Sequence, residues 1–267
     1  MDTLKQKLVK GTNEFRWDRR VVAFSVKLID ELQRNGVTPV RFAQKLSERA
    51  NNKEQFFDIL IEGRFATVLA RNNFLGIEIE YADKGADIKA GWNGSTIYFE
   101  VTRRAPNRED ICFSQGPGNG ESFVAEQIRT ETILGKIQGK LQQLENGATN
   151  IVVYCSETVS MGQPNMEEAF KYIKREIQED TERYKQLSGV LFTESVFNMD
   201  LKHPFTELRG FRLFRNEKAS SPLGVRLTKK LNSLDFICMY CGNNVIGKPP
   251  PRCHFCHHNK FKRPNPL

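Results

Sequence analysis

The sequence predicts an α/β protein in which helices flank a mixed β-sheet, and three observations support this fold class. Asn93-Gly94 lies between two segments of alternating polarity, which is the strongest short-range signal of a β-hairpin. The near-continuous apolar run at 150–156 is typical of a buried central strand. Along the chain, the apolar periodicity follows the order helix, three strands, helix, strand, helix and strands.

The N-terminal part of the chain is predicted to be helical after a polar start. Residues 1–15 are polar, and we expect them to be poorly ordered. Apolar residues at helical spacing predict helices at 17–34, from 39 onward, and at 53–71. The first two flank a turn that contains Gly36, so they form either a helix-turn-helix or a packing subdomain.

Strands and helices alternate in the rest of the chain. The polar segment 105–122 contains several glycines and is predicted to be a long loop. The other expected elements are a strand at 76–81, the hairpin, a helix at 123–144, a strand at 150–156, a helix at 165–187, and strands at 189–192 and 211–214.

The hairpin determines which side chains share a face of the sheet. A two-residue turn at Asn93-Gly94 pairs Trp92 with Ser95 and, further along, places Asp87 directly across from Glu100. One face then carries only apolar side chains fit for a core, namely Ile88, Ala90, Ile97, Phe99 and Val101. The other face carries Asp87, Lys89, Tyr98, Glu100 and Thr102.

Two carboxylates in direct opposition on neighbouring strands repel each other, because their Cβ atoms lie about 4.5–5.5 Å apart. A divalent cation held by carboxylate oxygens removes this repulsion. Asp87 and Glu100 are therefore candidate metal ligands. The alternative is an exposed edge face on which two acids meet without a function.

Asp87, followed across the hairpin by Glu100-Val101-Thr102, resembles the motif of the PD-(D/E)XK nuclease superfamily, which has the restriction-endonuclease-like fold. In that family an Asp on one strand and an acid-X-Lys on the next hold the metal and polarise water. The resemblance covers roughly residues 52–223 and implies Mg²⁺ or Mn²⁺ as cofactor. It implies as metal ligands Asp87, Glu100, the Val101 carbonyl and a helical acid, Glu62.

Thr102 stands where the family motif has its lysine, so either another lysine serves the site or the site is degraded. Lys140 and Lys136 lie four residues apart on the helix that the family packs near the metal, and we prefer Lys140, with Lys136 next. Lys89 is a rival because it shares the hairpin face with Asp87. The sequence does not choose among these three.

Glu62 lies inside the apolar stripe of the helix predicted at 53–71. An acid on an apolar face costs several kcal/mol unless it is paired or binds a metal. The resemblance favours a metal-linked role, because this helix directly precedes the hairpin. The alternative is a salt bridge to Arg64 or Arg71.

Two Cys-x2-Cys pairs near the C-terminus have the spacing of a zinc ribbon: Cys238, Cys241, Cys253 and Cys256. Each pair turns two thiolates toward one tetrahedral Zn²⁺. His254, His257 and His258 could replace a ligand, although four cysteines suffice. The module is too short for a core, so zinc would supply much of its folding energy.

Residues 236–267 include no acid, and their basic residues are candidates for nucleic-acid binding: Lys248, Arg252, Lys260, Lys262 and Arg263. Arg103 is a further candidate because of its position after the acidic motif. The alternative is a ribbon that caps the main domain or binds protein.

The whole-chain composition agrees with an interaction with nucleic acid. The chain has 40 basic and 32 acidic residues and a net charge of +8, which favours a polyanionic partner. No stretch approaches the roughly 20 apolar residues of a membrane span. The cysteine usage fits metal binding in a reducing compartment, so we expect a cytoplasmic protein without a membrane partner.

The sequence therefore predicts a metal-dependent nuclease, an endonuclease of PD-(D/E)XK type that acts on DNA. Its expected domains are an N-terminal helical segment (1–51), a nuclease core (52–230) and a zinc ribbon with a basic tail (231–267). One alternative is a catalytically inactive, nuclease-like subunit that binds nucleic acid or assembles with other proteins. Another is a dimeric transcriptional regulator. A homodimer and a protein partner in a larger complex are both left open.

Overall fold

The computed structural model describes residues 2–15, 18–79, 85–104, 119–156, 163–198, 205–238, 244–246 and 261–262. The chain folds into a mixed α/β structure, as expected. A six-stranded sheet has the order β1-β2-β3-β4-β5-β6, in which the central pairs β3-β4 and β4-β5 are parallel and the remaining pairs are antiparallel. These strands are β1 (Leu75–Ile79), β2 (Ile88–Trp92), β3 (Ser95–Arg104), β4 (Thr149–Ser156), β5 (Gly189–Asn198) and β6 (Phe205–Arg215).

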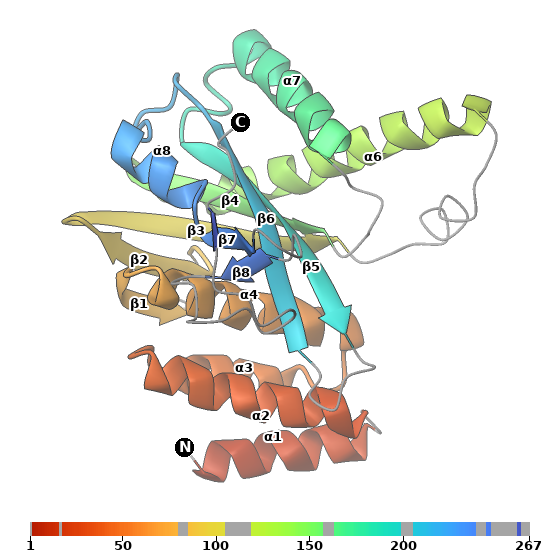
Figure 1. Ribbon diagram of the computed structural model, residues 1–267, viewed down its shortest axis with the longest axis vertical. Coiled ribbons are helices and arrows are strands. Elements are labelled where there is room, and N and C mark those ends of the chain that lie inside the picture. Colours follow the sequence, from red (N-terminus) through yellow and green to blue (C-terminus); the bar gives the residue numbers. More distant parts are fainter. Residues whose placement is uncertain are drawn as a thin grey trace.

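Helices cover both faces of this sheet (Figure 1). On one side lie α4 (Lys53–Arg71) and, beyond it, α1 (Asp2–Glu14), α2 (Arg19–Arg34) and α3 (Val40–Glu48). On the other side lie α6 (Asn119–Lys140) and α7 (Gln163–Glu179). A short 3-10 helix, η1 (Leu141–Gln143), directly follows α6, and α8 (Val225–Leu231) packs against β6.

The strands alternate their side chains between two hydrophobic cores, as the two-residue period of a strand requires. In β4, Ile151 and Val153 join the core shared with α4 and the N-terminal helices. Val152 and Tyr154 join the core formed with α6 and α7. Both faces of β4 are therefore buried, which explains its near-continuous apolar run.

The predicted hairpin and its register are confirmed. Trp92 pairs with Ser95, Ala90 with Ile97, and Ile88 with Phe99. Asn93 and Gly94 have φ angles of 48° and 79°, the left-handed conformation that a type I′ turn demands. The predicted apolar face is buried throughout, so the polar residues of β3 must face α6.

Several predicted boundaries need correction. Residues 2–14 form α1, and Leu8 is fully buried, so the expectation of a poorly ordered start was wrong. The helix expected at 165–187 ends at Glu179. Strands β5 and β6 are longer than predicted, because Gly210 (φ 68°) lies beside a register shift where the sequence pattern breaks. Of the expected strand 76–81 and loop 105–122, residues 80–81 and 105–118 lie outside the described residues. Residues 119–122 of the expected loop belong to α6.

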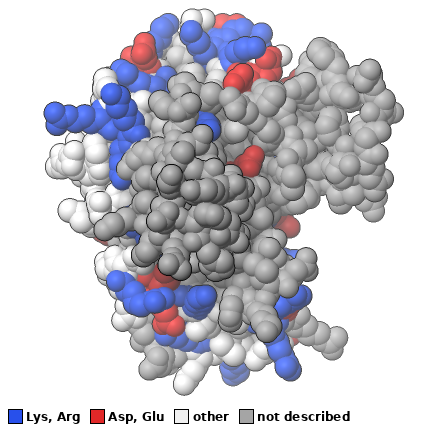
Figure 2. Space-filling view, viewed as in Figure 1, with Lys and Arg blue, Asp and Glu red and all other residues white. Residues whose placement is uncertain are grey.

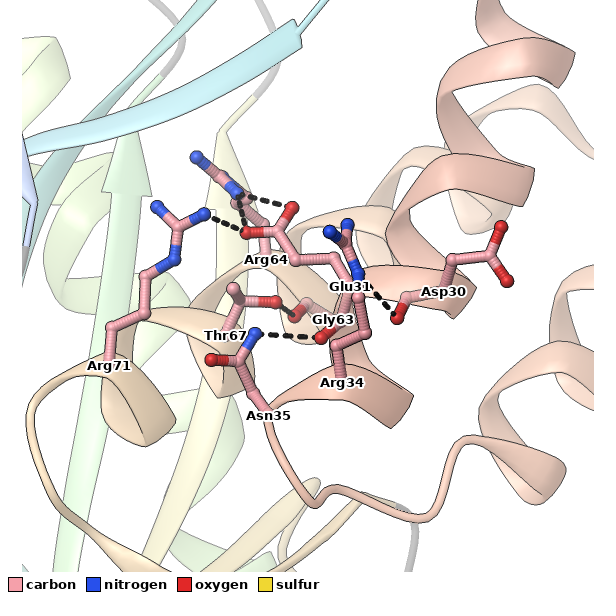
Figure 3. Close-up of polar contacts among 8 residues, drawn as sticks. All are labelled: Asp30, Glu31, Arg34, Asn35, Gly63, Arg64, Thr67 and Arg71. Carbon is pink, nitrogen blue, oxygen red and sulfur yellow. Dashed lines mark hydrogen bonds and ion pairs between the residues drawn. The ribbon is translucent and has the colours of Figure 1, made fainter.

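A charge cluster around the buried Arg64 joins α2 to α4 (Figure 3). The Nη1 atom of Arg64 lies 3.3 Å from both carboxylate oxygens of Glu31, and Arg71 also pairs with Glu31. The side chains of Glu31 and Arg64 are only 12% and 10% exposed. These contacts attach the N-terminal helices to the helix that supports the sheet.

We expect Glu31→Ala to lower the free energy of unfolding by about 3 kcal/mol, because it removes the carboxylate opposite a buried guanidinium. Glu14→Ala, which changes an exposed acid on α1, is the control and should shift stability by less than about 0.5 kcal/mol. Urea unfolding of both variants measures the difference. Equal stabilities would show that the cluster contributes nothing.

The C-terminal part contains a small three-stranded antiparallel sheet of order β8-β7-β9. Its strands are β7 (Asp235–Cys238), β8 (Asn244–Ile246) and β9 (Phe261–Lys262). The segment before it is tied to α4, since the Nδ2 of Asn72 donates to the Leu234 carbonyl at 3.0 Å. Leu227, Leu231 and Leu234 belong to the same core as α4.

Candidate active site

The hairpin brings Asp87 and Glu100 together on the α6 face of the sheet. Asp87 immediately precedes β2, and the register of β2 with β3 places it opposite Glu100. The Oδ2 atom of Asp87 accepts a hydrogen bond of 2.7 Å from the Val101 amide. This bond fixes the Asp87 carboxylate against the strand that carries Glu100.

Lys140, the last residue of α6, reaches both acids. Its Nζ atom lies 2.9 Å from Glu100 Oε2 and 3.4 Å from Asp87 Oδ2. It also donates to Gln143 Oε1 at 2.9 Å. Of the three lysines that the sequence offered, Lys140 is thus the one whose ammonium the structure places between the two carboxylates.

The other two lysines lie elsewhere. Lys136 is exposed one turn earlier on α6. Lys89 forms an ion pair of 3.0 Å with Glu78 on the neighbouring strand β1. Thr102, at the position of the motif lysine, is buried.

Burial dominates the electrostatics of the site. The Glu100 side chain is fully buried, whereas those of Asp87 and Lys140 are 14% and 21% exposed. Burial raises the pKa of Glu100 to about 8; the charge of Asp87 adds to the rise, and Lys140 opposes it. Burial alone would lower the pKa of Lys140, but Asp87 and Glu100 outweigh it and raise that pKa above its ordinary value.

The raised pKa of Glu100 predicts a pH-dependent stability. Between the ordinary pKa of 4.5 and the folded value of about 8, the folded state binds a proton that the unfolded state has released. Metal-free stability should therefore fall as pH rises through this window, by at most about 5 kcal/mol. Urea unfolding in chelator from pH 5 to 9 measures this trend, which Glu100→Gln should flatten. An equal slope in the variant would contradict the assignment.

Glu62 lies on α4 with 6% exposure, within electrostatic reach of the site, since its charge contributes to the raised pKa of Lys140. The arginines considered as its salt-bridge partners, Arg64 and Arg71, both pair with Glu31. Within the described residues, no three His, Cys, Asp or Glu side chains form a group arranged to hold a metal ion. Glu62 is therefore within electrostatic reach of Lys140, and it does not complete a three-acid cluster with Asp87 and Glu100.

The donor set suits Mg²⁺, which is usually bound by one or two carboxylates together with water and substrate phosphate. Asp87 and Glu100 supply two carboxylates, and the fully buried Oε1 of Glu100 has no hydrogen-bond partner within the described part of the chain. Such a buried oxygen is costly unless a cation or water compensates it. The residues present therefore fit a divalent cation.

Arg103 has a structural environment that sequence reasoning missed. Its side chain is 4% exposed and forms ion pairs with Glu54 and Asp58 on α4. Its guanidinium carbon lies over the Phe57 ring, 5.6 Å from the ring centroid. In the sequence, the feature that could have indicated these ion pairs is the four-residue spacing of the acids Glu54 and Asp58 at the start of that helix. These ion pairs join the end of β3 to α4, so Arg103 is not available as an exposed nucleic-acid contact.

The C-terminal candidates fall largely outside the described residues. Cys238 ends β7, where it pairs with Phe261 of β9. Cys241, Cys253 and Cys256 lie outside the described residues, as do Lys248, Arg252, Lys260 and Arg263. Lys262 belongs to β9.

No protein-family model, curated protein or solved structure matches this chain. In the part of the chain that the structure describes, no helix combines the length and apolar character needed to cross a membrane.

Proposed function

We propose that this protein is a metal-dependent nuclease that hydrolyses phosphodiester bonds of DNA, with a restriction-endonuclease-like core. The single observation that carries this proposal is the Lys140 ammonium 2.9 Å from Glu100 and 3.4 Å from Asp87. Two acids and a lysine are the side chains that the PD-(D/E)XK motif requires. Here the lysine comes from α6, in place of Thr102.

The proposed roles follow from the contacts. Asp87, Glu100 and the Val101 carbonyl would hold Mg²⁺ or Mn²⁺, with Glu62 assisting from α4. The ion would lower the pKa of a bound water and neutralise charge on the phosphate. Lys140 orients the attacking water or offsets the developing negative charge with its ammonium. The hydrogen bond from the Val101 amide keeps Asp87 directed at the site.

Basic surface supports a polyanionic substrate. On the face seen in Figure 2, Lys and Arg side chains gather where α8 lies in Figure 1, with acidic side chains interspersed elsewhere. Arg226 and Lys229 of α8 are exposed. Together with the net charge of +8, this favours binding to nucleic-acid phosphates. We also propose a cytoplasmic location, from the cysteine usage.

The test is incubation of the full-length protein with supercoiled DNA, linear DNA, single-stranded DNA and RNA, in Mg²⁺, Mn²⁺ or chelator. Metal-dependent cutting of DNA is expected. Thr102 stands in place of the motif lysine, which favours a second candidate, a nuclease-like subunit that binds nucleic acid without cutting it. Salt-sensitive binding without cleavage of any substrate would support that candidate.

We further propose that Cys238, Cys241, Cys253 and Cys256 bind one Zn²⁺ that stabilises the β7-β8-β9 sheet and presents the basic tail. Cys253→Ser should reduce bound zinc from about one ion per chain to near zero. Nucleic-acid affinity should fall, and its salt dependence should become weaker. Cys155→Ser changes a buried cysteine in β4 and is the control for zinc content. Full zinc occupancy in Cys253→Ser would contradict the ligand set.

A further inference from the structure

Gln143 holds the Lys140 ammonium on the side of the site that is nearer to solvent. The chain tightens from α6 into η1, and Lys140 is the residue that precedes η1. Residues three apart eclipse in a 3-10 helix, so Gln143 is placed over Lys140. The Lys140 Nζ donates to Gln143 Oε1 at 2.9 Å. Gln143 is exposed, whereas Glu100 on the other side of the ammonium is fully buried.

The acceptors of the Lys140 ammonium differ in charge. Glu100 and Asp87 are acidic, and Gln143 is a neutral amide. A divalent cation at the two acids would use the same carboxylates and would repel the ammonium. The hydrogen bond from Lys140 to Gln143 is weakened least when such a cation binds, because the attraction between this amide and the ammonium does not depend on the carboxylates.

We propose that Gln143 is a positioning residue, which retains Lys140 at the site when a divalent cation takes up the Asp87 and Glu100 carboxylates. This inference rests on the proposed function in one respect, namely that a divalent cation binds there. Without Gln143, the ammonium has only the carboxylates as described partners and competes with the cation for them. Gln143 therefore favours cation binding although it does not contact the cation.

The test is a double-mutant cycle on Mn²⁺ affinity in the full-length protein, measured from the electron paramagnetic resonance signal of free Mn²⁺. Gln143→Met keeps the side-chain length and removes the acceptor, and it should weaken Mn²⁺ binding by about tenfold. Lys140→Met removes the competing cation and should strengthen binding. In the Lys140→Met background, Gln143→Met should have no further effect.

The control variant is Gln142→Met, which changes the neighbouring exposed glutamine of η1 and should leave Mn²⁺ affinity unchanged. Loss of binding in Asp87→Asn assigns the measured ion to this site. The comparison of Gln143→Met with Gln142→Met stands even if Lys140→Met fails to fold. Three results would each overturn the proposal. These are equal Mn²⁺ affinities in these two variants, additive effects in the double-mutant cycle, and no Mn²⁺ binding to the unaltered protein.

Cleavage provides a separate readout. Gln143→Met should lower kcat on DNA and leave KM unchanged, because Lys140 does not hold the substrate in the ground state. If the Mn²⁺ cycle behaves as expected and no protein cuts, the nuclease proposal fails and the role of Gln143 stands. If DNA is cut and Mn²⁺ affinity does not depend on Gln143, the nuclease proposal stands and the positioning role fails.

Discussion

Glu100→Gln and Asp87→Asn should each reduce metal-dependent DNA cleavage by at least about 10³-fold. Both changes keep the size of the side chain and remove the negative charge that a divalent cation requires. Binding of DNA in chelator should be nearly unchanged, because neither acid would attract the phosphate backbone. The measurement is the initial rate of nicking of supercoiled DNA, with binding followed by fluorescence anisotropy.

The two variants should differ in stability, which separates the chemical role from a folding defect. Above pH 8, Glu100→Gln should be more stable than the unaltered protein, because it removes a charge from a fully buried position. Asp87→Asn weakens an acceptor of both Lys140 and the Val101 amide, and should be less stable. Glu78→Gln, an acid on β1 of the same sheet, is the control for activity. Cleavage near the normal rate in either site variant would contradict the assignment.

Lys140→Met should lower the cleavage rate by about 10²–10⁴-fold, because it removes the ammonium that orients water or offsets charge. Lys136→Met provides a matched control on the same helix, since Lys136 is exposed one turn away. Both variants lose one positive charge from α6, so a difference between their cleavage rates reports the position of the lysine on the helix. Equal rates in the two variants would show that Lys140 has no special role.

A compensating change tests whether Lys140 replaces the motif lysine. Thr102 lies on β3, two residues after Glu100 and on the same face of the strand. Thr102→Lys in the Lys140→Met background should restore part of the lost rate. Thr102→Gln in the same background supplies a long polar side chain without charge, so it should not. If Thr102→Gln restored the cleavage rate as well as Thr102→Lys does, the positive charge of Lys140 would not be what the reaction requires.

The parts of the fold that depend on local sequence could be predicted. Asn93-Gly94 allows few turn types, so the register of β2 with β3, and hence the opposition of Asp87 and Glu100, followed from the residues themselves. Helix α4 matched its predicted bounds, because its Asn52 N-cap and its apolar pattern are local signals. Polar helix α1 was missed, since its stability comes from tertiary packing of residues such as Leu8.

The choice among Lys140, Lys136 and Lys89 could not be made from the sequence. It depends on how α6 docks on the sheet, and helical periodicity does not determine how a helix is rotated about its axis or how far it is shifted along that axis relative to β3. The pairing of Arg64 and Arg71 with Glu31 was out of reach for the same reason, because these contacts join residues at least 33 positions apart. Local patterns defined the elements, whereas tertiary docking determined which charges meet.

Nicking of supercoiled DNA by the full-length protein, with Mg²⁺ or with chelator, is the decisive test of whether Asp87, Glu100 and Lys140 form a nuclease site. Unaltered protein and Glu100→Gln should be purified in parallel, so that any contaminating nuclease is common to both. We expect nicking that requires Mg²⁺ and is absent in Glu100→Gln. Nicking at the same rate by both proteins would contradict this expectation.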